Sequence, residues 1–141
     1  MHKDTYFLFT FILIATIATL HTLAYIFFWY WTLWWFDILM HFLGGLWVAV
    51  TSLWFFYLSG YVRKPKVDFK TCLLITLGSI LVIGALWEVF ELSVGAYRET
   101  NHVLDTAIDL IMDVIGSILG LFLFIKARPI SSVEESIHVD K

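Results

Sequence analysis

Seven side chains that can bind a metal ion or carry a proton lie inside or at the ends of long apolar segments. They comprise one histidine and six carboxylates: Asp37, His41, Glu88, Glu91, Asp105, Asp109 and Asp113. An ionisable side chain at the centre of a membrane helix costs about 2.5–3.5 kcal/mol on insertion scales, and such residues commonly serve a function. These seven residues are therefore the candidate functional site.

The spacing within each group places its members on one face of a helix. Neighbouring members are three or four positions apart, as in Asp37/His41, Glu88/Glu91 and Asp105/Asp109/Asp113. Residues at these spacings lie next to each other on a helix surface. Glycines continue the same faces, at positions 44, 45, 84, 95, 116 and 120. Because small residues allow helices to pack closely, the acid-bearing faces are predicted to point into a bundle.

A divalent metal ion is the interpretation that this group of residues favours. Carboxylates held close together in a low dielectric cannot all stay ionised without compensation, and no lysine or arginine lies at their expected depth. Carboxylates with one imidazole suit Zn²⁺, Mn²⁺ or Fe²⁺, and the oxygen-rich subset suits Mg²⁺ or Ca²⁺. All seven residues are predicted metal ligands, which would suffice for two ions. Shared protons or a water-filled cavity are the other ways to relieve the charge.

Three functions remain open. In the first, the protein is a metal-dependent hydrolase or transferase that acts on a lipid-linked substrate, with Glu88 as the catalytic general base. In the second, it transports protons or cations, and the only further polar groups in the other halves of the helices are Thr51, Ser52, Thr76 and Ser79. In the third, it is a non-catalytic assembly protein whose acids bind a basic segment of a partner. A nucleophilic serine or cysteine site is not expected, because Cys72 lies at the opposite side of the membrane from the acids.

The composition predicts the elements that must position these residues. The chain has 141 residues, of which 60% are hydrophobic and 15% charged, against about 45–50% and 25% in soluble domains. Its mean hydropathy is +0.85, which indicates an integral membrane protein in the lipid bilayer. Apolar runs over residues 6–30, 34–58, 71–96 and 106–125 can each cross the bilayer. The expected fold is an all-α bundle of four transmembrane helices over residues 1–128, with a disordered tail over residues 129–141.

The basic residues predict which side of the membrane each connection faces. Eight of the nine lysines and arginines lie at the N-terminus, in the second connection or in the tail. Arg98, in the third connection, is the exception. By the positive-inside rule both termini are cytoplasmic. At 1.5 Å per residue, the expected depth is roughly 6–12 Å below the outer interface for His41, Glu88, Glu91, Asp109 and Asp113, and the edge of that interface for Asp37 and Asp105. No basic patch with interleaved aromatics indicates nucleic-acid binding.

Two further features each have two interpretations. The aromatic cluster Trp29, Tyr30, Trp31, Trp34 and Trp35 is typical of an interfacial belt, and otherwise could form a wall for a lipid or sugar head group. His21, at the depth of the acids, is expected to be a hydrogen-bonded packing residue, with a further metal ligand or a proton shuttle as the alternative. Four helices with a polar centre could also form a homodimer.

The combined motifs resemble those of a known family. They are Asp37-x3-His41-x2-Gly44-Gly45, Trp87-Glu88-x2-Glu91 and Asp105-x3-Asp109-x3-Asp113-x2-Gly116. Over residues 34–122 the chain resembles the YjdF-like family of uncharacterised bacterial integral membrane proteins and, more distantly, VanZ-like membrane proteins. The resemblance implies a multi-pass protein of a prokaryotic inner (cytoplasmic) membrane and no particular activity. Many YjdF-like members have additional spans that this chain lacks.

Overall fold

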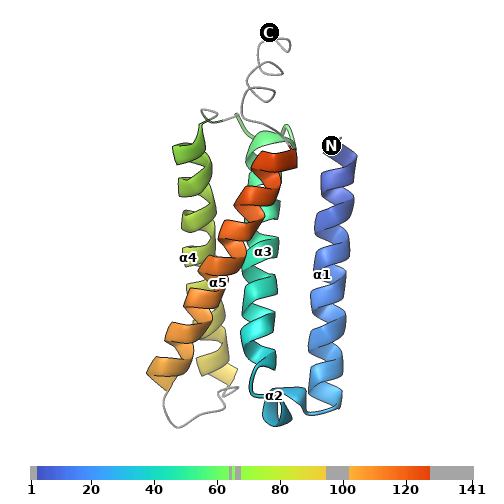
Figure 1. Cartoon of the computed structure of the whole chain (residues 1–141), viewed down its shortest axis with the longest axis vertical. Helices are drawn as coiled ribbons and strands as arrows, with labels where there is room; N and C mark the ends of the chain where they lie inside the picture. Colours follow the sequence, from blue (N-terminus) through green and yellow to red (C-terminus); the bar gives the residue numbers. More distant parts are fainter. Residues whose placement is uncertain (1–2, 64, 66–67, 95–101, 128–141) are drawn as a thin grey trace.

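Every regular element that the described residues form is a helix. The computed structural model describes residues 3–63, 65, 68–94 and 102–127 (Figure 1). Four long helices, α1 (Lys3–Ile26), α3 (Phe36–Tyr57), α4 (Phe69–Val94) and α5 (His102–Ala127), are accompanied by one short helix, α2 (Trp29–Thr32). The predicted all-α fold is therefore confirmed. The predicted tail, residues 129–141, lies outside the described residues.

Each of the four long helices is long and apolar enough to cross a membrane. Their spans are Thr5–Ile26, Phe36–Tyr57, Phe69–Ser93 and Val103–Ala127, with hydropathies between 1.7 and 2.3. A helix of 22 residues is about 33 Å long, which matches the roughly 30 Å hydrocarbon core. The four predicted spans are confirmed, and the chain is a multi-pass membrane protein.

The first helix ends earlier than predicted. The predicted first span continues to residue 30, whereas α1 ends at Ile26 and α2 begins at Trp29. Phe28 between them has φ 59° and ψ 30°, in the left-handed region. A non-glycine residue rarely adopts this conformation, and it breaks the right-handed helical path. The break turns the chain so that α2 lies across the end of the bundle, which we name the α2 end (Figure 1).

Helix α3 is the centre of the bundle. It packs against α1, α4 and α5, and its closest partner is α5. The span of α3 is also the most buried of the four, at 44%, and the span of α1 is the least buried, at 11%. Figure 1 shows α1 and α4 on opposite sides of α3, while α5 runs obliquely from the α4 side across the front of α3. Apolar packing fills the half opposite the α2 end, around the buried residues Leu53, Tyr57, Leu121 and Phe124.

Two glycines allow the backbones of α3 and α5 to touch. A Cβ atom at Gly45 would collide with the carbonyl oxygen of Asp113, and one at Gly116 would collide with the carbonyl oxygen of Phe42. Gly120 would likewise come within 2.7 Å of the Ala49 side chain. Without a hydrophobic force between helices in lipid, such close contact is a main source of stability. It also brings the aspartates of α5 against the polar face of α3.

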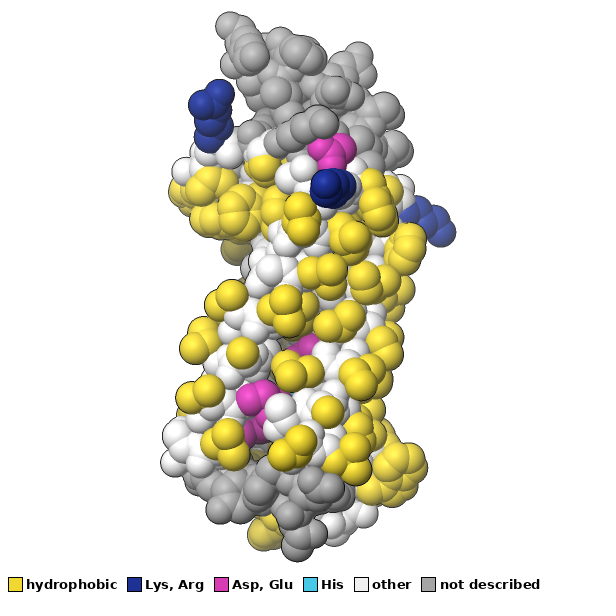
Figure 2. Space-filling view, turned by 90° about the vertical axis from the view of Figure 1, so that its left-hand side faces the viewer, with side chains coloured by type: hydrophobic (Ala, Val, Ile, Leu, Met, Phe, Trp, Pro, Cys, Tyr) yellow, Lys and Arg dark blue, Asp and Glu magenta, His cyan; other side chains and the backbone are white. Residues whose placement is uncertain are grey.

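The surface has the charge pattern of a membrane protein. Apolar side chains cover most of the length of the bundle, and lysine and arginine side chains lie near the end opposite α2 (Figure 2). The basic residues that the structure describes there are Arg63 before α4, Lys70 in the first turn of α4 and Lys126 in the last turn of α5. Lys64, Lys66 and Arg98, on which the predicted orientation also depends, lie outside the described residues. The cytoplasmic location of the termini therefore stays a prediction.

Candidate metal centre

The seven predicted site residues lie in the same half of the bundle, near the α2 end. Asp37 and His41 are on the first two turns of α3, and the two glutamates are on the last turns of α4. The three aspartates of α5 occupy its first three turns. Because α4 runs towards the α2 end and both α3 and α5 run away from it, these turns lie at a similar depth. Acidic side chains are visible in this half of the surface in Figure 2.

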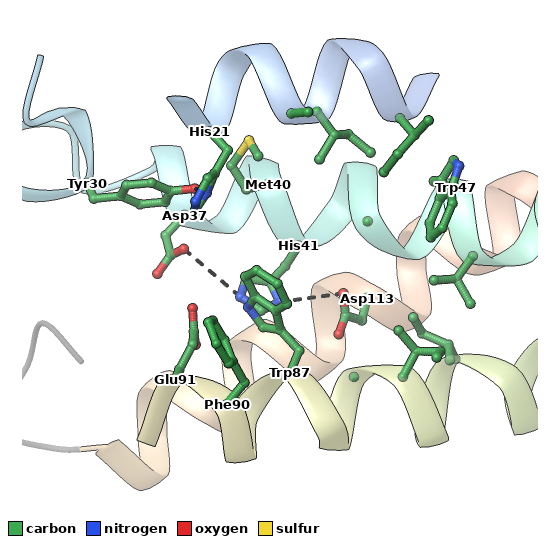
Figure 3. A pocket seen from close by; sticks show the side chains of 18 of the residues that line it. His21, Tyr30, Asp37, Met40, His41, Trp47, Trp87, Phe90, Glu91 and Asp113 are labelled. Carbon is green, nitrogen blue, oxygen red and sulfur yellow. Dashed lines mark hydrogen bonds and ion pairs between the residues drawn. The ribbon is translucent and has the colours of Figure 1, made fainter. Parts of the chain in front are cut away.

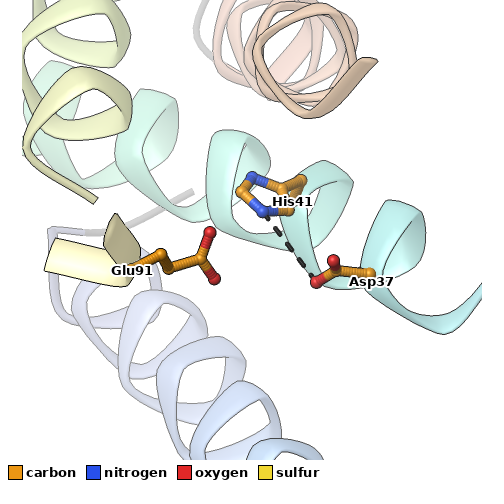
Figure 4. A group of neighbouring side chains, drawn as sticks. All are labelled: Asp37, His41 and Glu91. Atoms are coloured by element: carbon orange, nitrogen blue, oxygen red, sulfur yellow. Dashed lines mark ion pairs between the residues drawn. The ribbon is translucent and has the colours of Figure 1, made fainter. Parts of the chain in front are cut away.

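His41 is at the centre of the cluster. Its Nε2 atom lies 4.0 Å from Asp37 Oδ1 and 3.9 Å from Asp109 Oδ1. Its Nδ1 atom lies 3.5 Å from Asp113 Oδ1. The imidazole is buried, as are Asp109 and Asp113 of α5. Figure 4 shows the Glu91 carboxylate from α4 facing the same ring beside Asp37.

Six of the seven residues form three overlapping groups with the spacing of metal ligands. In each group, one possible ligand atom per residue lies within 4.8 Å of the others, in the triads Asp37/His41/Glu91, His41/Glu88/Asp109 and Asp37/Asp105/Asp109. Ligand atoms around one ion at 2.0–2.6 Å are at most about 4–5 Å apart. The spacing of each triad therefore fits a divalent ion. Asp113 is in none of these triads, and its contact is with the other nitrogen of His41.

Glu88 has one anchored oxygen and one unpartnered oxygen. The hydroxyl of Thr106 on α5 donates a 2.7 Å hydrogen bond to Oε2. Oε1 is buried and has no hydrogen-bond partner within the described residues. A buried polar atom without a partner costs about 1–3 kcal/mol, and more when it is charged, so it calls for a specific explanation such as a bound ion. Since Glu88 belongs to the triad with His41 and Asp109, this carboxylate supports a missing ligand independently of the residue types.

Basic side chains contribute little to the cluster. Within the part of the chain that the structure describes, the basic partner of Asp109 and of Asp113 is His41. Arg63, Lys70 and Lys126 belong to the opposite end of the bundle. One imidazole cannot neutralise several buried carboxylates, so protons, a metal ion or water must compensate the remaining charge.

A cavity of about 670 Å³ adjoins the acids (Figure 3). It is lined by α1, α2, α3 and α4, with Asp113 from α5. Figure 3 shows Asp37, His41 and Glu91 towards one end, while Trp47 and aliphatic side chains line the other. Cavities of about 300–1,000 Å³ are typical of small-molecule sites. The polar end of this cavity is therefore continuous with the candidate metal centre.

His21 and Tyr30 form the wall of the cavity opposite the acids. The Nδ1 atom of His21 lies 2.8 Å from the hydroxyl oxygen of Tyr30, and its ring meets Trp87 edge-on at 6.4 Å. His21 is in none of the triads, so the structure agrees with the expected hydrogen-bonded packing role. Burial and the nearby carboxylates of Asp37 and Glu91 raise the pKa of Tyr30, which keeps this hydroxyl neutral.

Thr106 is the site residue that the sequence analysis missed. It follows Asp105 on α5, and a threonine beside a row of aspartates carries no distinctive signal of its own. Its contact with Glu88 depends on how α4 and α5 pack, which the two residues' separation of 18 positions does not reveal. Tyr30, assigned there to an aromatic belt, was likewise not expected to pair with His21.

The fold and the cluster together define a multi-pass helical membrane protein with a buried acidic and histidine centre. The chain belongs to the family described as "predicted membrane protein (DUF2238)", which matches residues 3–129. No curated protein and no solved structure matches the chain.

Proposed function

We propose that the protein binds one or two divalent metal ions in this cluster and is a metal-dependent hydrolase or transferase for a lipid-linked substrate. The observation that carries the proposal is the buried, unpartnered Oε1 atom of Glu88, a residue whose carboxylate has an oxygen within 4.8 Å of possible ligand atoms of His41 and Asp109. The candidate ions are Zn²⁺, Mn²⁺, Fe²⁺, Mg²⁺ and Ca²⁺, since carboxylates and imidazole accept all of them. Asp37, Glu91 and Asp105 complete the proposed ligand set.

His41 and Asp113 have complementary roles in this proposal. Nε2 of His41 faces Asp37 and Asp109, so it is the nitrogen that would bind an ion. Nδ1 would then carry the proton, beside the carboxylate of Asp113, whose Oδ1 atom lies 3.5 Å away. A carboxylate behind a ligating imidazole fixes its tautomer and orientation. Asp113, first predicted as a ligand, is therefore proposed as the residue that positions His41.

Glu88 is the proposed general base. Thr106 fixes the orientation of this carboxylate through Oε2, which leaves Oε1 to contact an ion or to accept a proton from water beside it. A bound divalent ion would supply Lewis acidity and lower the pKa of a coordinated water. The cavity next to the cluster offers room for the substrate. The location in an inner membrane, with the site towards the outer leaflet, follows from the distribution of basic residues and from the YjdF-like resemblance, and stays part of this proposal.

Transport of a proton or cation is the second candidate function, favoured by two hydroxyl groups. Thr51 on α3 and Thr76 on α4 have buried Oγ1 atoms without hydrogen-bond partners among the described residues. Both lie in the helix halves beyond the acids, about 15–18 Å further along their helices from His41 and Glu88. They could receive an ion that leaves the cluster. A flux assay in proteoliposomes separates this function from catalysis.

Elemental analysis of the full chain, purified in detergent, tests the metal site. We expect a stoichiometric divalent metal that chelation removes and that returns when the metal is added back. Glu88→Gln keeps the shape of the side chain and should lower the metal content. Asp68→Asn is the matched control, because Asp68 accepts a hydrogen bond from the backbone of Thr71 at the start of α4, far from the cluster. Folded protein that holds no metal after incubation with Zn²⁺, Mn²⁺, Mg²⁺, Ca²⁺ or, under anaerobic conditions, Fe²⁺ would refute the proposal.

A further inference from the structure

The cavity beside the acids changes from polar to apolar along its length. Asp37 and Val48 both line it on α3, and Glu91 and Ile80 both line it on α4. At 1.5 Å per residue, each pair spans about 16 Å along its helix. On α1 the lining likewise runs from Tyr25 near the α2 end to Ile14. All three helices thus give the cavity the same extent, from the acids to about the middle of the membrane spans.

The apolar half of the cavity lies between two helices that hardly touch. Helices α1 and α4 each pack against α3, but among the described residues they make at most weak contact with each other. Their described ring contact is His21 with Trp87, at the polar end. Ile14, Ile17 and Ile83 line the walls beyond that contact. Because these residues belong to the membrane spans, the gap between α1 and α4 faces the acyl chains of the bilayer.

The polar end has two walls of different chemistry. The acids and His41 come from α3, α4 and α5, whereas the facing wall carries His21 and Tyr30. When the Tyr30 hydroxyl donates to Nδ1 of His21, the neutral imidazole carries its proton on Nε2, which is then a donor. A ligand between the walls would therefore meet the proposed metal ion on one side and the Nε2–H donor of His21 on the other. Both favour anionic oxygens, and an ammonium head group could not bind the ion.

We propose that the cavity binds a lipid phosphate, with its phosphate oxygens between the metal centre and His21 and with one apolar chain lying between α1 and α4. This inference rests on the proposed metal function and names its substrate class. A phosphate ester has several unesterified oxygens, so it can contact the ion and the donor wall together. The substrate reaches the site sideways from the bilayer, without leaving the membrane.

Tryptophan substitutions that fill the apolar half of the cavity test the proposed position of the lipid's apolar chain. Ala18 lines the cavity on α1, and Ala15 on the same helix is exposed but does not line it. Ile83 and Val82 form the equivalent pair on α4, with Ile83 in the lining and Val82 exposed beside it. Ala18→Trp and Ile83→Trp should obstruct the chain, while Ala15→Trp and Val82→Trp are matched controls. Two pairs on different helices keep the test valid if one variant fails to fold.

Binding of dodecyl phosphate and of inorganic phosphate is measured for each variant in dodecyl maltoside, after loading with Mn²⁺. Dodecyl phosphate partitions into the detergent to the same extent for every variant. The ratio of the apparent dissociation constants of two variants therefore reports the effect of the substitution in the cavity. We expect Ala18→Trp and Ile83→Trp to weaken dodecyl phosphate binding at least ~10-fold, equivalent to about 1.4 kcal/mol. The affinities of these two variants for inorganic phosphate and for Mn²⁺ should equal those of the control variants.

The outcomes separate this inference from the proposed function. Equal dodecyl phosphate binding in the lining and control variants would refute the proposed position of the lipid's apolar chain between α1 and α4, but would leave the proposed metal centre unaffected. Equal weakening of inorganic phosphate would show that the tryptophans act on the polar end, and would also overturn it. Wild-type protein that binds Mn²⁺ but neither phosphate would refute the substrate class alone. Wild-type protein that binds no metal would refute the proposed function, and the inference with it.

Discussion

The hydroxyl of Thr106 on α5 donates a 2.7 Å hydrogen bond to Glu88 Oε2 on α4. This contact joins the two helices beside His41 and leaves the other oxygen of Glu88 without a partner. A carboxylate that rotated freely could turn both oxygens towards any nearby donor. The threonine therefore fixes the orientation of the Glu88 carboxylate, with Oε2 turned towards α5.

Thr106→Val should weaken metal binding because it removes this hydrogen bond at nearly constant volume. Loss of an outer contact to a ligand typically costs about 10–100-fold in metal affinity. Metal titration of the chelated protein measures the change. Thr106→Ser keeps the hydroxyl and should stay close to wild type, and equal affinities for the valine and serine variants would contradict the role of Thr106.

Chelation should lower the thermal midpoint of the wild-type protein in detergent. A metal that binds only the folded state stabilises it by about 2.7 kcal/mol at a hundredfold excess over its Kd. Asp109→Asn together with Asp113→Asn should abolish the response, because one proposed ligand and the partner of His41 Nδ1 are lost. Asp68→Asn should respond as wild type does. A wild-type midpoint that is the same with and without chelator and added metal would argue for a purely structural acid network.

Tyr30→Phe should change the dependence of stability on alkaline pH. Burial and the carboxylates of Asp37 and Glu91 raise the pKa of Tyr30 in the folded protein. The unfolded chain then loses this proton first, near pH 10, so the contribution of Tyr30 to stability is present below that pH and is lost as pH rises above it. In chelator, the thermal midpoint of wild type should therefore fall more steeply than that of Tyr30→Phe between about pH 9 and 11. Parallel curves would contradict the raised pKa.

Cysteine labelling in intact cells tests the predicted orientation. In a Cys72→Ser background, Trp34→Cys and Tyr61→Cys each place an exposed thiol, because the replaced side chains are 73% and 80% exposed. Trp34 lies at the α2 end and Tyr61 in the connection at the other end. The positive-inside rule predicts that a membrane-impermeant maleimide labels Trp34→Cys and spares Tyr61→Cys until the cells are lysed. The reverse pattern would move the metal centre to the cytoplasmic leaflet.

Gly116→Ala should destabilise the bundle, because its Cβ atom would collide with the backbone of Phe42 on α3. Overpacking typically costs about 1–3 kcal/mol. Gly78→Ala is the control: its Cβ atom would meet no atom within 4 Å, and alanine favours a helix by about 1 kcal/mol over glycine. Thermal unfolding in detergent should rank Gly78→Ala at or above wild type and Gly116→Ala below it. Similar losses in both variants would contradict the tight contact of α3 with α5.

The sequence predicted those features that depend on one helix at a time. Apolar runs with flanking charges gave the four spans, and spacings of three and four put Asp37 with His41 and Asp109 with Asp113. The common depth of the acids then followed from the alternating direction of the helices. Phe28 shows one limit, because an aromatic residue in the left-handed region carries none of the glycine or proline signals that mark a break.

Features that depend on how helices face each other could not be predicted from one sequence. The contact between Thr106 and Glu88 requires the rotation of α5 about its axis relative to α4. The same rotation decides that Asp113 meets Nδ1 of His41 and lies outside the ligand triads. The cavity needs the positions of α1, α3 and α4 together, and no spacing within a single helix encodes the gap between α1 and α4.

The tightest helix pair, α3 with α5, is separated along the chain by the whole of α4. During synthesis α3 and α4 leave the ribosome before α5, so His41 and Glu88 are delivered without the aspartates and Thr106 that surround them in the finished protein. The glycine contacts at positions 45 and 116 can form only when α5 arrives. The centre can therefore be completed only after α5 has been inserted, and a fragment that stops before α5 would leave the polar groups of α3 and α4 without their partners on α5 in the bilayer.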